Sequence, residues 1–376
     1  MTEPCVLHVV LSLCPGGAER LVIDMARAQQ RSMAVAICCL DAPGAWAGQA
    51  TEAGIPVDAL NRTPGFHPSL GARIAEVAHR RGATIIHSHQ YSPFVYGSLA
   101  QWRVPGAAHV VTEHGKRADE RLTLKRRLAN SVLTRLPHAI VAVSERLRGD
   151  LIAEGYPADR VTVIHNGIEL GPPVSPRDRE SARGHLGLPA GVPVIGTVAR
   201  LDPVKDLGTL LRAFAIVRRQ VPAARLVMIG DGPERGALER EADGLALDDS
   251  VLWAGMRDDA RELLEGFDVF VNSSLNEGIS VTVLEAMAAQ LPVVATRVGG
   301  TPEVLVDAKT GVLVPPQDPE AMARAIGIYA ADAAAREDAG RAGLERVASA
   351  FAFDRMMRQY HEVCATVAGG RAHVRH

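Results

Sequence analysis

Short runs of apolar, mainly β-branched residues alternate along the chain with longer segments in which apolar residues recur at helical spacing. The first of these units are a strand predicted at residues 6–13, a helix at 18–29 and a strand at 35–40. Further strands are predicted in this half of the chain at 84–87, 109–112, 140–143 and 161–164. Because strands that alternate with helices pair in parallel, the pattern predicts a parallel sheet flanked by helices.

The alternation is interrupted after residue 170 by Gly171-Pro172-Pro173 and Ser175-Pro176, a proline-rich stretch typical of a hinge. It then resumes with an amphipathic helix over 207–217 and with strands at 194–198, 225–229, 251–253, 269–272 and 292–295. We therefore expect an α/β protein of two Rossmann-like, doubly wound parallel-sheet domains, 1–170 and 171–350, that face a cleft. Residues 351–376 are expected to form a C-terminal helix that packs back toward the first domain, followed by a flexible tail.

The composition is that of an ordinary globular protein, with 47% of the 376 residues hydrophobic and 22% charged. A formal net charge of −2 offers no attraction to nucleic acid, so that class of partner is excluded. The 5 cysteines are odd in number and form no C-x-x-C pair, so neither a disulfide framework nor a zinc site is predicted. The apolar run at 6–13 is too short to span a membrane. We expect a cytoplasmic protein, with attachment to the inner membrane face left open.

The first candidate binding loop lies between the first predicted strand and its helix and contains Gly16 and Gly17. Two glycines allow positive φ angles and close approach of a ligand, and the helix start offers free N–H groups to an anion. A tight strand-to-helix turn would need the same residues, so the loop alone leaves both interpretations open.

A second candidate loop follows the strand at 194–198 and contains two cations, Arg200 and Lys205. Asp206 is placed to cap the next helix, so both cations converge on a helix start, as a site for a diphosphate requires. A solvated surface ion pair is the alternative. The flanking Gly196 and Pro203 favour a specific loop and hence the anion site.

The strongest candidate is the segment that follows the strand at 269–272. Glu277 lies in the loop, Ser280 is expected to cap the next helix, and Glu285 lies one turn into that helix on the face of Val281 and Ala289. A carboxylate on an apolar face is costly unless it binds something, and a vicinal diol of a ribose or hexose would satisfy it. A lone helical glutamate would suggest a cap or a salt bridge, but two glutamates eight positions apart after a strand favour binding.

Histidines and a further glycine-rich loop are weaker candidates. His87 and His89 share one face of a strand, but no third ligand with suitable spacing is apparent, so no metal site is predicted. His114 follows another strand and precedes a glycine, and a structural role is as plausible as a functional one. The loop at 230–236 has the spacing G-x-G-x-x-x-G with an internal proline, which is weak support for dinucleotide binding.

Nine motifs spread over the whole chain together resemble a known family. They are GGAER at 16–20, TEHG at 112–115, VSE at 143–145, VIHNGI at 163–168, GTVARLDPVKD at 196–206, IGDGPER at 229–235, EGISVTVLEAMA at 277–288, GGTPEVL at 299–305 and TGVLVPP at 310–316. The pattern resembles the GT-B glycosyltransferases of family 4, which are retaining enzymes that use nucleotide sugars. The resemblance implies that the first domain binds the acceptor and the second binds the nucleotide sugar.

The resemblance also implies a role for each motif residue. Arg200 and Lys205 would bind the donor diphosphate and stabilise the leaving nucleotide, Glu285 would hold the ribose hydroxyls, and Glu277 would contact the donor sugar. Gly16 and Gly17 would approach the phosphates, Met256 and Arg257 would meet the base, and His114 would lie beside the transferred sugar across the cleft. The implied donor site also includes Gly278, Ser280 and Val281, and the acceptor-side candidates are His89 and Glu113. Ser280 stands where many relatives carry glycine.

The implied chemistry is metal-independent hexosyl transfer with no cofactor, from a UDP-sugar in the simplest case. No D-x-D motif occurs in the sequence, so Arg200, Lys205 and a helix terminus would take the place of a metal as charge stabilisers. Retention without a nucleophile suggests attack on the face that the nucleotide leaves, with the donor phosphate assisting deprotonation. A glycan or lipid-linked acceptor in cell-envelope or exopolysaccharide synthesis is the expected partner.

Residues 116–136 suggest contact with an anionic membrane surface. Seven cations stand here against Asp119 and Glu120, interleaved with leucines, so that a basic amphipathic helix can form. The alternative is a solvated helix whose leucines enter the core.

Three other functions remain as alternatives to the transferase. A GT-B sugar-nucleotide epimerase would share the fold without an acceptor, and a non-catalytic nucleotide-sugar-binding subunit would share the donor site. An NAD(P) dehydrogenase rests on the loop at 230–236 alone.

Overall fold

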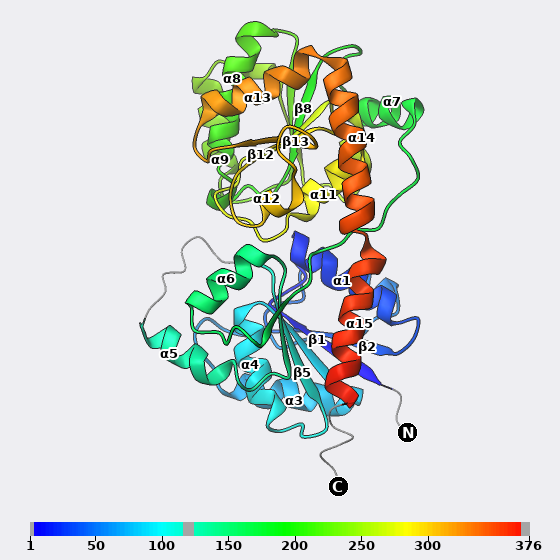
Figure 1. Ribbon diagram of the computed structural model, residues 1–376, viewed down its shortest axis with the longest axis vertical. Coiled ribbons are helices and arrows are strands. Elements are labelled where there is room, and N and C mark those ends of the chain that lie inside the picture. The colour runs from blue at the N-terminus through cyan, green and yellow to red at the C-terminus, as the bar shows by residue number, and fades with distance from the viewer. Residues whose placement is uncertain (1–3, 116–123, 370–376) are drawn as a thin grey trace. The chain divides into compact units, whose positions relative to one another are not determined.

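The structure is a computed structural model in which residues 4–115 and 124–369 are described. Within this part of the chain the protein forms two compact units (Figure 1). Unit 1 consists of residues 4–115, 124–166 and 356–369, and unit 2 consists of residues 167–355. Each unit contains one parallel β-sheet with helices packed against it, as the alternation of elements predicts.

Unit 1 has a seven-stranded sheet in the order β3-β2-β1-β4-β5-β6-β7. Its strands are β1 (Cys5–Val10), β2 (Ala34–Cys39), β3 (Val57–Ala59), β4 (Ile85–His89), β5 (Ala108–Glu113), β6 (Ala139–Ala142) and β7 (Val161–Val163). The predicted strands are confirmed, although β1 ends at Val10 rather than residue 13. The sequence pattern missed β3, a half-buried edge strand whose three residues carry no clear alternation.

The helices of unit 1 connect these strands and cover the sheet. They are α1 (Gly17–Gln29), α2 (Ala47–Glu52), α3 (Ser69–Arg81), α4 (Tyr91–Gln101), α5 (Leu124–Leu133), α6 (Glu145–Ala153) and, from the end of the chain, α15 (Phe353–Gly369). Cys364 and Val367 of α15 pack against Val6, Ile85 and Val110 of the sheet. The last helix of the chain therefore completes the core of unit 1.

Unit 2 has a six-stranded sheet in the order β10-β9-β8-β11-β12-β13. Its strands are β8 (Val194–Val198), β9 (Arg225–Ile229), β10 (Val251–Gly255), β11 (Val269–Asn272), β12 (Val293–Thr296) and β13 (Gly311–Val314). Its helices are α7 (Pro176–His185), α8 (Leu207–Gln220), α9 (Arg235–Gly244), α10 (Ala260–Leu263), α11 (Val281–Ala288), α12 (Thr301–Val304), α13 (Pro319–Ala331) and α14 (Ala333–Ala350). The apolar face of the amphipathic helix predicted at 207–217 is buried in α8.

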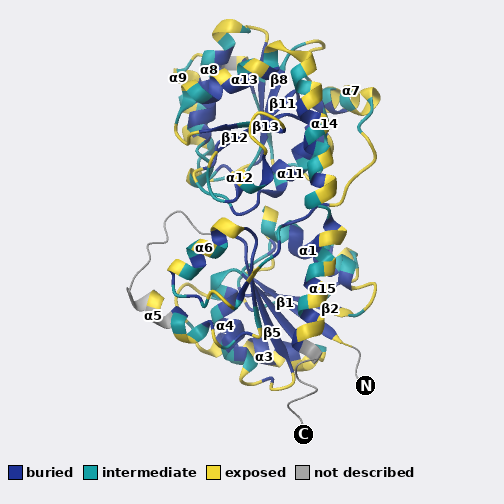
Figure 2. Cartoon of the chain, in the orientation of Figure 1, coloured by how far each residue is buried: buried dark blue, intermediate teal, exposed yellow. Residues whose placement is uncertain are grey.

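Burial follows the pattern expected for parallel sheets covered on both faces. The central strands of both sheets are buried, the edge strands β3 and β10 are half-buried, and most exposed residues lie on the helices and in loops (Figure 2). Among the described helices, none is both long and apolar enough to cross a membrane.

Candidate active site

The strand order of unit 2 determines where a ligand would bind. β8 lies between β9 and β11, so the chain leaves β8 toward one side of the sheet and leaves β11 toward the other. In open parallel sheets the loops that follow two such strands diverge and leave a crevice at their carboxyl ends. These loops, 199–206 and 273–280, are the two that contain Arg200, Lys205 and Glu277.

An ion pair joins the two loops directly. Nζ of Lys205 lies 2.7 Å from Oε1 of Glu277, and the side chains are 25% and 10% exposed. The same oxygen accepts hydrogen bonds from Oγ of Ser274 at 2.7 Å and from Nδ2 of Asn272 at 3.2 Å. Burial alone would raise the pKa of Glu277, but the Lys205 ammonium and these hydrogen bonds outweigh it and hold the pKa below its usual value. Glu277 is therefore an anion with a fixed orientation.

Both polar groups of this pair keep the capacity to bind a ligand. All three hydrogen bonds to the Glu277 carboxylate go to Oε1, and within the described residues none engages Oε2. The Lys205 ammonium has three N–H groups, of which one donates to Glu277. A sugar hydroxyl at Oε2 and a phosphate oxygen at Nζ are thus compatible with the ion pair.

Arg200 is held more loosely than Lys205. Its guanidinium is 62% exposed and lies 2.5 Å from the carboxylate of Asp202. An exposed pair of this kind contributes about 0–1 kcal/mol, so a more highly charged anion would compete for the guanidinium. The structure therefore places both predicted cations at the switch point, each already beside a carboxylate.

Two predicted helix caps differ from expectation. Asp206 precedes α8 with φ 45°, but its carboxylate accepts a hydrogen bond from the Thr209 hydroxyl at 2.8 Å and caps no backbone N–H. Ser280 precedes α11, and its hydroxyl contacts Oγ1 of Thr282 at 3.2 Å and Nδ2 of Asn272 at 3.5 Å instead of capping the helix. In both cases a nearby side chain competes with the backbone for the capping group.

The glycines at 230 and 232 have a packing explanation. A Cβ atom at Gly230, where φ is 133°, would lie 1.9 Å from the carbonyl oxygen of Ala199, and one at Gly232 would lie 2.3 Å from that of Leu201. The backbone N–H of Leu201 donates to the carbonyl of Asp231 at 3.0 Å. These glycines allow the loop after β9 to support the loop that holds Arg200. They give no support to a dinucleotide site.

Gly299 is a site residue whose role the sequence reasoning missed. Its φ is 50°, and a Cβ atom there would lie 1.8 Å from the carbonyl oxygen of Glu277. The next residue, Gly300, donates its N–H to that same carbonyl at 3.1 Å. The loop after β12 therefore supports the backbone of Glu277. The glycine pair was visible in the sequence, but its partner was not.

The remaining donor-site candidates of unit 2 lie on the same carboxyl edge of the sheet. Glu285 is half-buried on α11, one turn after the buried Val281, and Gly278 is buried in the loop before it. Met256 follows β10 and is 48% exposed. Arg257 donates two hydrogen bonds to Asp259, at 2.7 and 2.6 Å.

In unit 1 the glycine pair at 16–17 begins α1 as predicted, but the conformational reason differs. Gly16 is the residue before the helix and has φ −176°, which any residue can adopt. Positive φ is therefore not what requires glycine at this position. A Cβ atom there would lie 2.3 Å from Oε2 of Glu19, so the absence of a side chain keeps this helix start open.

The acceptor-side candidates lie at the carboxyl ends of β4 and β5. Nδ1 of His89 lies 3.0 Å from Nε2 of His114. Burial lowers the pKa of His114 to about 4, so its ring is neutral at pH 7. Oε1 of Glu113 accepts a hydrogen bond from the Tyr156 hydroxyl at 3.3 Å. The structure thus brings His89 and His114 together and directs Glu113 to a different partner.

Comparison with known proteins assigns the family. Residues 192–332 match the family described as glycosyl transferases group 1, and residues 15–171 match the family described as glycosyltransferase family 4. The chain is 30% identical to the alpha-maltose-1-phosphate synthase of Mycobacterium tuberculosis over 93% of this chain and 96% of that protein. It is 34% identical to the lipopolysaccharide core biosynthesis glycosyltransferase LpsE of Rhizobium meliloti over 49% of this chain and 53% of that protein.

The fold has close counterparts among solved structures. The structure of Anabaena Alr3699/HepE in complex with UDP and glucose superposes with a TM-score of 0.85 and 24% sequence identity, covering 96% of this chain and 99% of that one. The resemblance seen in the sequence motifs is confirmed. The chain belongs to the family 4 glycosyltransferases, glycosyl transferases group 1, and has their GT-B fold.

Proposed function

We propose that this glycosyltransferase moves a hexose from a nucleoside diphosphate sugar, in the simplest case a UDP-sugar, to a sugar-containing acceptor with retention of configuration. The observation that carries the proposal is the Lys205–Glu277 ion pair at the switch point of unit 2. It places a cation for a phosphate next to a carboxylate for sugar hydroxyls, which is the pair of contacts that a nucleotide sugar needs.

The donor diphosphate is proposed to lie between Lys205 and Arg200. Lys205 keeps its place through Glu277, whereas the exposed Arg200 exchanges Asp202 for the phosphate. As the C1–O bond to the phosphate breaks, negative charge grows on the leaving diphosphate. The two cations therefore stabilise the transition state more strongly than they stabilise the bound donor. This assignment makes transfer independent of a metal ion at the diphosphate.

Retention is proposed to follow from attack on the face that the nucleotide leaves. The acceptor oxygen forms a bond to C1 while the C1–O bond to the phosphate breaks, and the acceptor proton passes to the departing phosphate oxygen. The protein supplies orientation and charge stabilisation, and the phosphate itself serves as the base.

The acceptor is proposed to be a glycan or lipid-linked sugar of the cell envelope or an exopolysaccharide. Support comes from the partial match to LpsE, whose name refers to lipopolysaccharide core synthesis. The whole-length match to a relative named for alpha-maltose 1-phosphate makes a small phosphorylated sugar the second candidate.

A panel of UDP-, GDP- and ADP-sugars tests the proposal, first by thermal shift and then by turnover with glucose 1-phosphate or a lipid-linked sugar. We expect one nucleotide series to raise the melting temperature and the product to be an α-glycoside when the donor is α-linked, by NMR. Turnover that needs an acceptor and persists in EDTA would support transfer without a metal. Conversion of the donor to an epimer without acceptor would instead support the epimerase alternative.

A further inference from the structure

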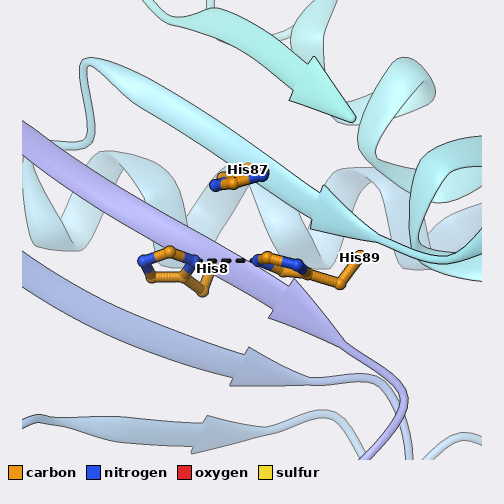
Figure 3. A group of neighbouring side chains, drawn as sticks. All are labelled: His8, His87 and His89. Atoms are coloured by element: carbon orange, nitrogen blue, oxygen red, sulfur yellow. Dashed lines mark hydrogen bonds between the residues drawn. The ribbon is translucent and has the colours of Figure 1, made fainter. Parts of the chain in front are cut away.

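Unit 1 contains a cluster of histidines that the proposed transfer does not use in full. In the parallel pairing of β1 with β4, His8 stands opposite His87, and His89 follows two residues later on the same face. The three rings lie together at the carboxyl ends of these neighbouring strands (Figure 3). Each offers one nitrogen, and the three nitrogens lie within 4.8 Å of one another. The sequence alone pairs His87 with His89 but gives no sign of His8, which is 79 positions away from His87.

The outer nitrogen of each ring is held by a different polar group. Nε2 of His8 lies 2.7 Å from Oε1 of Gln29, and Nε2 of His87 lies 2.8 Å from Oγ1 of Thr112. Nδ1 of His89 lies 3.0 Å from Nε2 of His114. Hydrogen bonds of this kind on the far nitrogen are what orient histidines that bind metal ions.

The inner nitrogens are only partly satisfied by one another. Nδ1 of His8 and Nε2 of His89 are 2.9 Å apart and share a hydrogen bond. Nδ1 of His87 is fully buried and, among the described residues, has no hydrogen-bond partner. When Nε2–H of His87 donates to Thr112, Nδ1 carries a buried lone pair without a partner. Such a lone pair costs free energy in an apolar interior, and an electrophile at the centre of the three rings would remove that cost.

We propose that His8, His87 and His89 form a binding site for a divalent transition-metal ion, with Nδ1 of His8, Nδ1 of His87 and Nε2 of His89 as ligands. Three neutral imidazoles suit Zn²⁺, whose bonds to histidine nitrogen are about 2.0–2.1 Å long. The three nitrogens already lie within 4.8 Å of one another, so the rings would close around the ion to reach such distances. The ion would tie β1 to β4 at the switch point of unit 1.

The protonation of the cluster already suits this site. Burial lowers the pKa of His8 to about 4 and lowers those of His87 and His89 well below the ordinary value. All three rings are therefore neutral at pH 7, and no proton must be lost before an ion binds. The hydrogen bond from Nε2 of His8 to the Gln29 carbonyl leaves Nδ1 with its lone pair.

Binding of an ion would also change the tautomer of His114. Without the ion, Nε2–H of His89 donates to His8, so Nδ1 of His89 accepts from Nε2–H of His114. With the ion on Nε2 of His89, the proton resides on Nδ1 and donates to Nε2 of His114. His114 would then carry its proton on Nδ1, the nitrogen that has no partner among the described groups.

The metal content of the full chain, produced without a polyhistidine tag, tests the proposal. The protein is unfolded in EDTA, refolded with excess Zn²⁺, passed over a chelating resin and measured by inductively coupled plasma mass spectrometry. We expect about one Zn²⁺ per chain, and X-ray absorption should show nitrogen ligands at about 2.0–2.1 Å. Less than about a tenth of an equivalent in the folded wild type would overturn the proposal and leave the cluster as hydrogen-bonded neutral imidazoles.

A matched pair of variants identifies the ligands. His87→Leu removes the proposed ligand atom Nδ1, which has no hydrogen-bond partner among the described residues, and we expect at least a tenfold fall in affinity for Zn²⁺. His109→Leu is the control, because His109 is also fully buried, lies on the adjacent strand β5 and contacts Ser88 through its ring Nε2. Equal Zn²⁺ content in both variants would contradict the assignment. If neither variant folds, the nitrogen count of the wild-type absorption spectrum decides the question.

Discussion

Lys205 and Glu277 lie 72 positions apart in the chain, yet Nζ of one and Oε1 of the other are 2.7 Å apart. The contact spans the two loops that diverge at the switch point of unit 2, so it links the order of the strands to the chemistry of the site. Because the carboxylate is buried and makes three hydrogen bonds, removal of either partner affects both the fold of the loops and the binding of a ligand.

Lys205→Ala should weaken binding of the nucleotide sugar or slow transfer at least tenfold. The variant loses a charge-assisted contact worth about 1.5–3 kcal/mol and leaves the Glu277 carboxylate without its cation. Isothermal titration with donor and initial-rate kinetics measure the loss. Lys309→Ala is the matched control, because Lys309 is exposed and precedes β13, at the amino end of the sheet. Equal effects of the two substitutions would refute the diphosphate assignment.

Substitutions of Glu277 and of Glu285 should have different effects on the affinity for free nucleotide. Glu285→Ala is expected to weaken binding of the nucleoside diphosphate itself, because the resemblance implies that Glu285 holds the ribose hydroxyls. Glu277→Gln keeps the size of the side chain and should lower turnover at least tenfold while free-nucleotide affinity changes less than threefold. Identical titration curves for the two variants would show that the two roles are not divided in this way.

Gly299→Ala tests whether the loop after β12 supports the site. The new Cβ atom would clash with the Glu277 carbonyl at a φ of 50°, so we expect a loss of roughly 1–3 kcal/mol in stability and weaker donor binding. Gly327→Ala is the control, because Gly327 lies inside α13 with open space around its Cβ position. That substitution should be neutral or stabilising by about 0.5–1 kcal/mol. Thermal unfolding with and without donor separates the two effects.

Periodicity and turn residues were sufficient to predict most of the fold. Buried parallel strands are continuous apolar runs, and the strands around Val6 and Val269 were found for that reason. The edge strand β3 was missed because half-buried residues at the border of a sheet show no such run. Boundaries were less accurate, as the end of β1 at Val10 shows.

Only those parts of the candidate site whose residues share one loop could be predicted from the sequence. Arg200 and Lys205 share a loop, and so the sequence could place them together. Lys205 reaches Glu277 from a loop 72 positions away, and His87 lies opposite His8 on a separate strand, so nothing local in the sequence records these pairings. The capping of α8 and α11 was predicted incorrectly because Thr209 and Asn272 compete for the capping side chains.

A basic amphipathic segment at 116–136 predicts binding to anionic membranes. Residues 116–123 lie outside the described residues, whereas the next segment forms α5, with Arg127 and Val132 exposed. Each cation near an anionic surface contributes about 1 kcal/mol, so flotation with phosphatidylserine vesicles should carry the protein at low salt and release it at high salt. Charge reversal at Lys125, Arg126 and Arg127 should abolish flotation without changing donor affinity. Flotation with neutral vesicles, or none at low salt, would argue for a soluble acceptor.

Acid should unfold unit 1 before unit 2, because buried histidines are concentrated in unit 1. Burial lowers the pKa of His8 and His114 to about 4 and that of His109 to about 3, and it lowers those of His87 and His89 as well. Between pH 6.5 and pH 4 the unfolded chain binds protons that the folded chain does not. The free energy of unfolding of unit 1 is therefore highest above pH 6.5. It falls as the pH drops, by about 1.4 kcal/mol per pH unit for each such histidine.

Urea unfolding in EDTA at pH 7.5, 6.0 and 5.0 measures this dependence, with Trp253 as a reporter of unit 2 and Trp46 as a reporter of unit 1. The midpoint seen by Trp46 should fall steeply with pH, whereas the midpoint seen by Trp253 should change little. His109→Leu should reduce the pH dependence of the unfolding free energy of unit 1 by the contribution of one histidine. Equal pH dependence at both tryptophans would mean that the buried histidines of unit 1 do not control its acid stability.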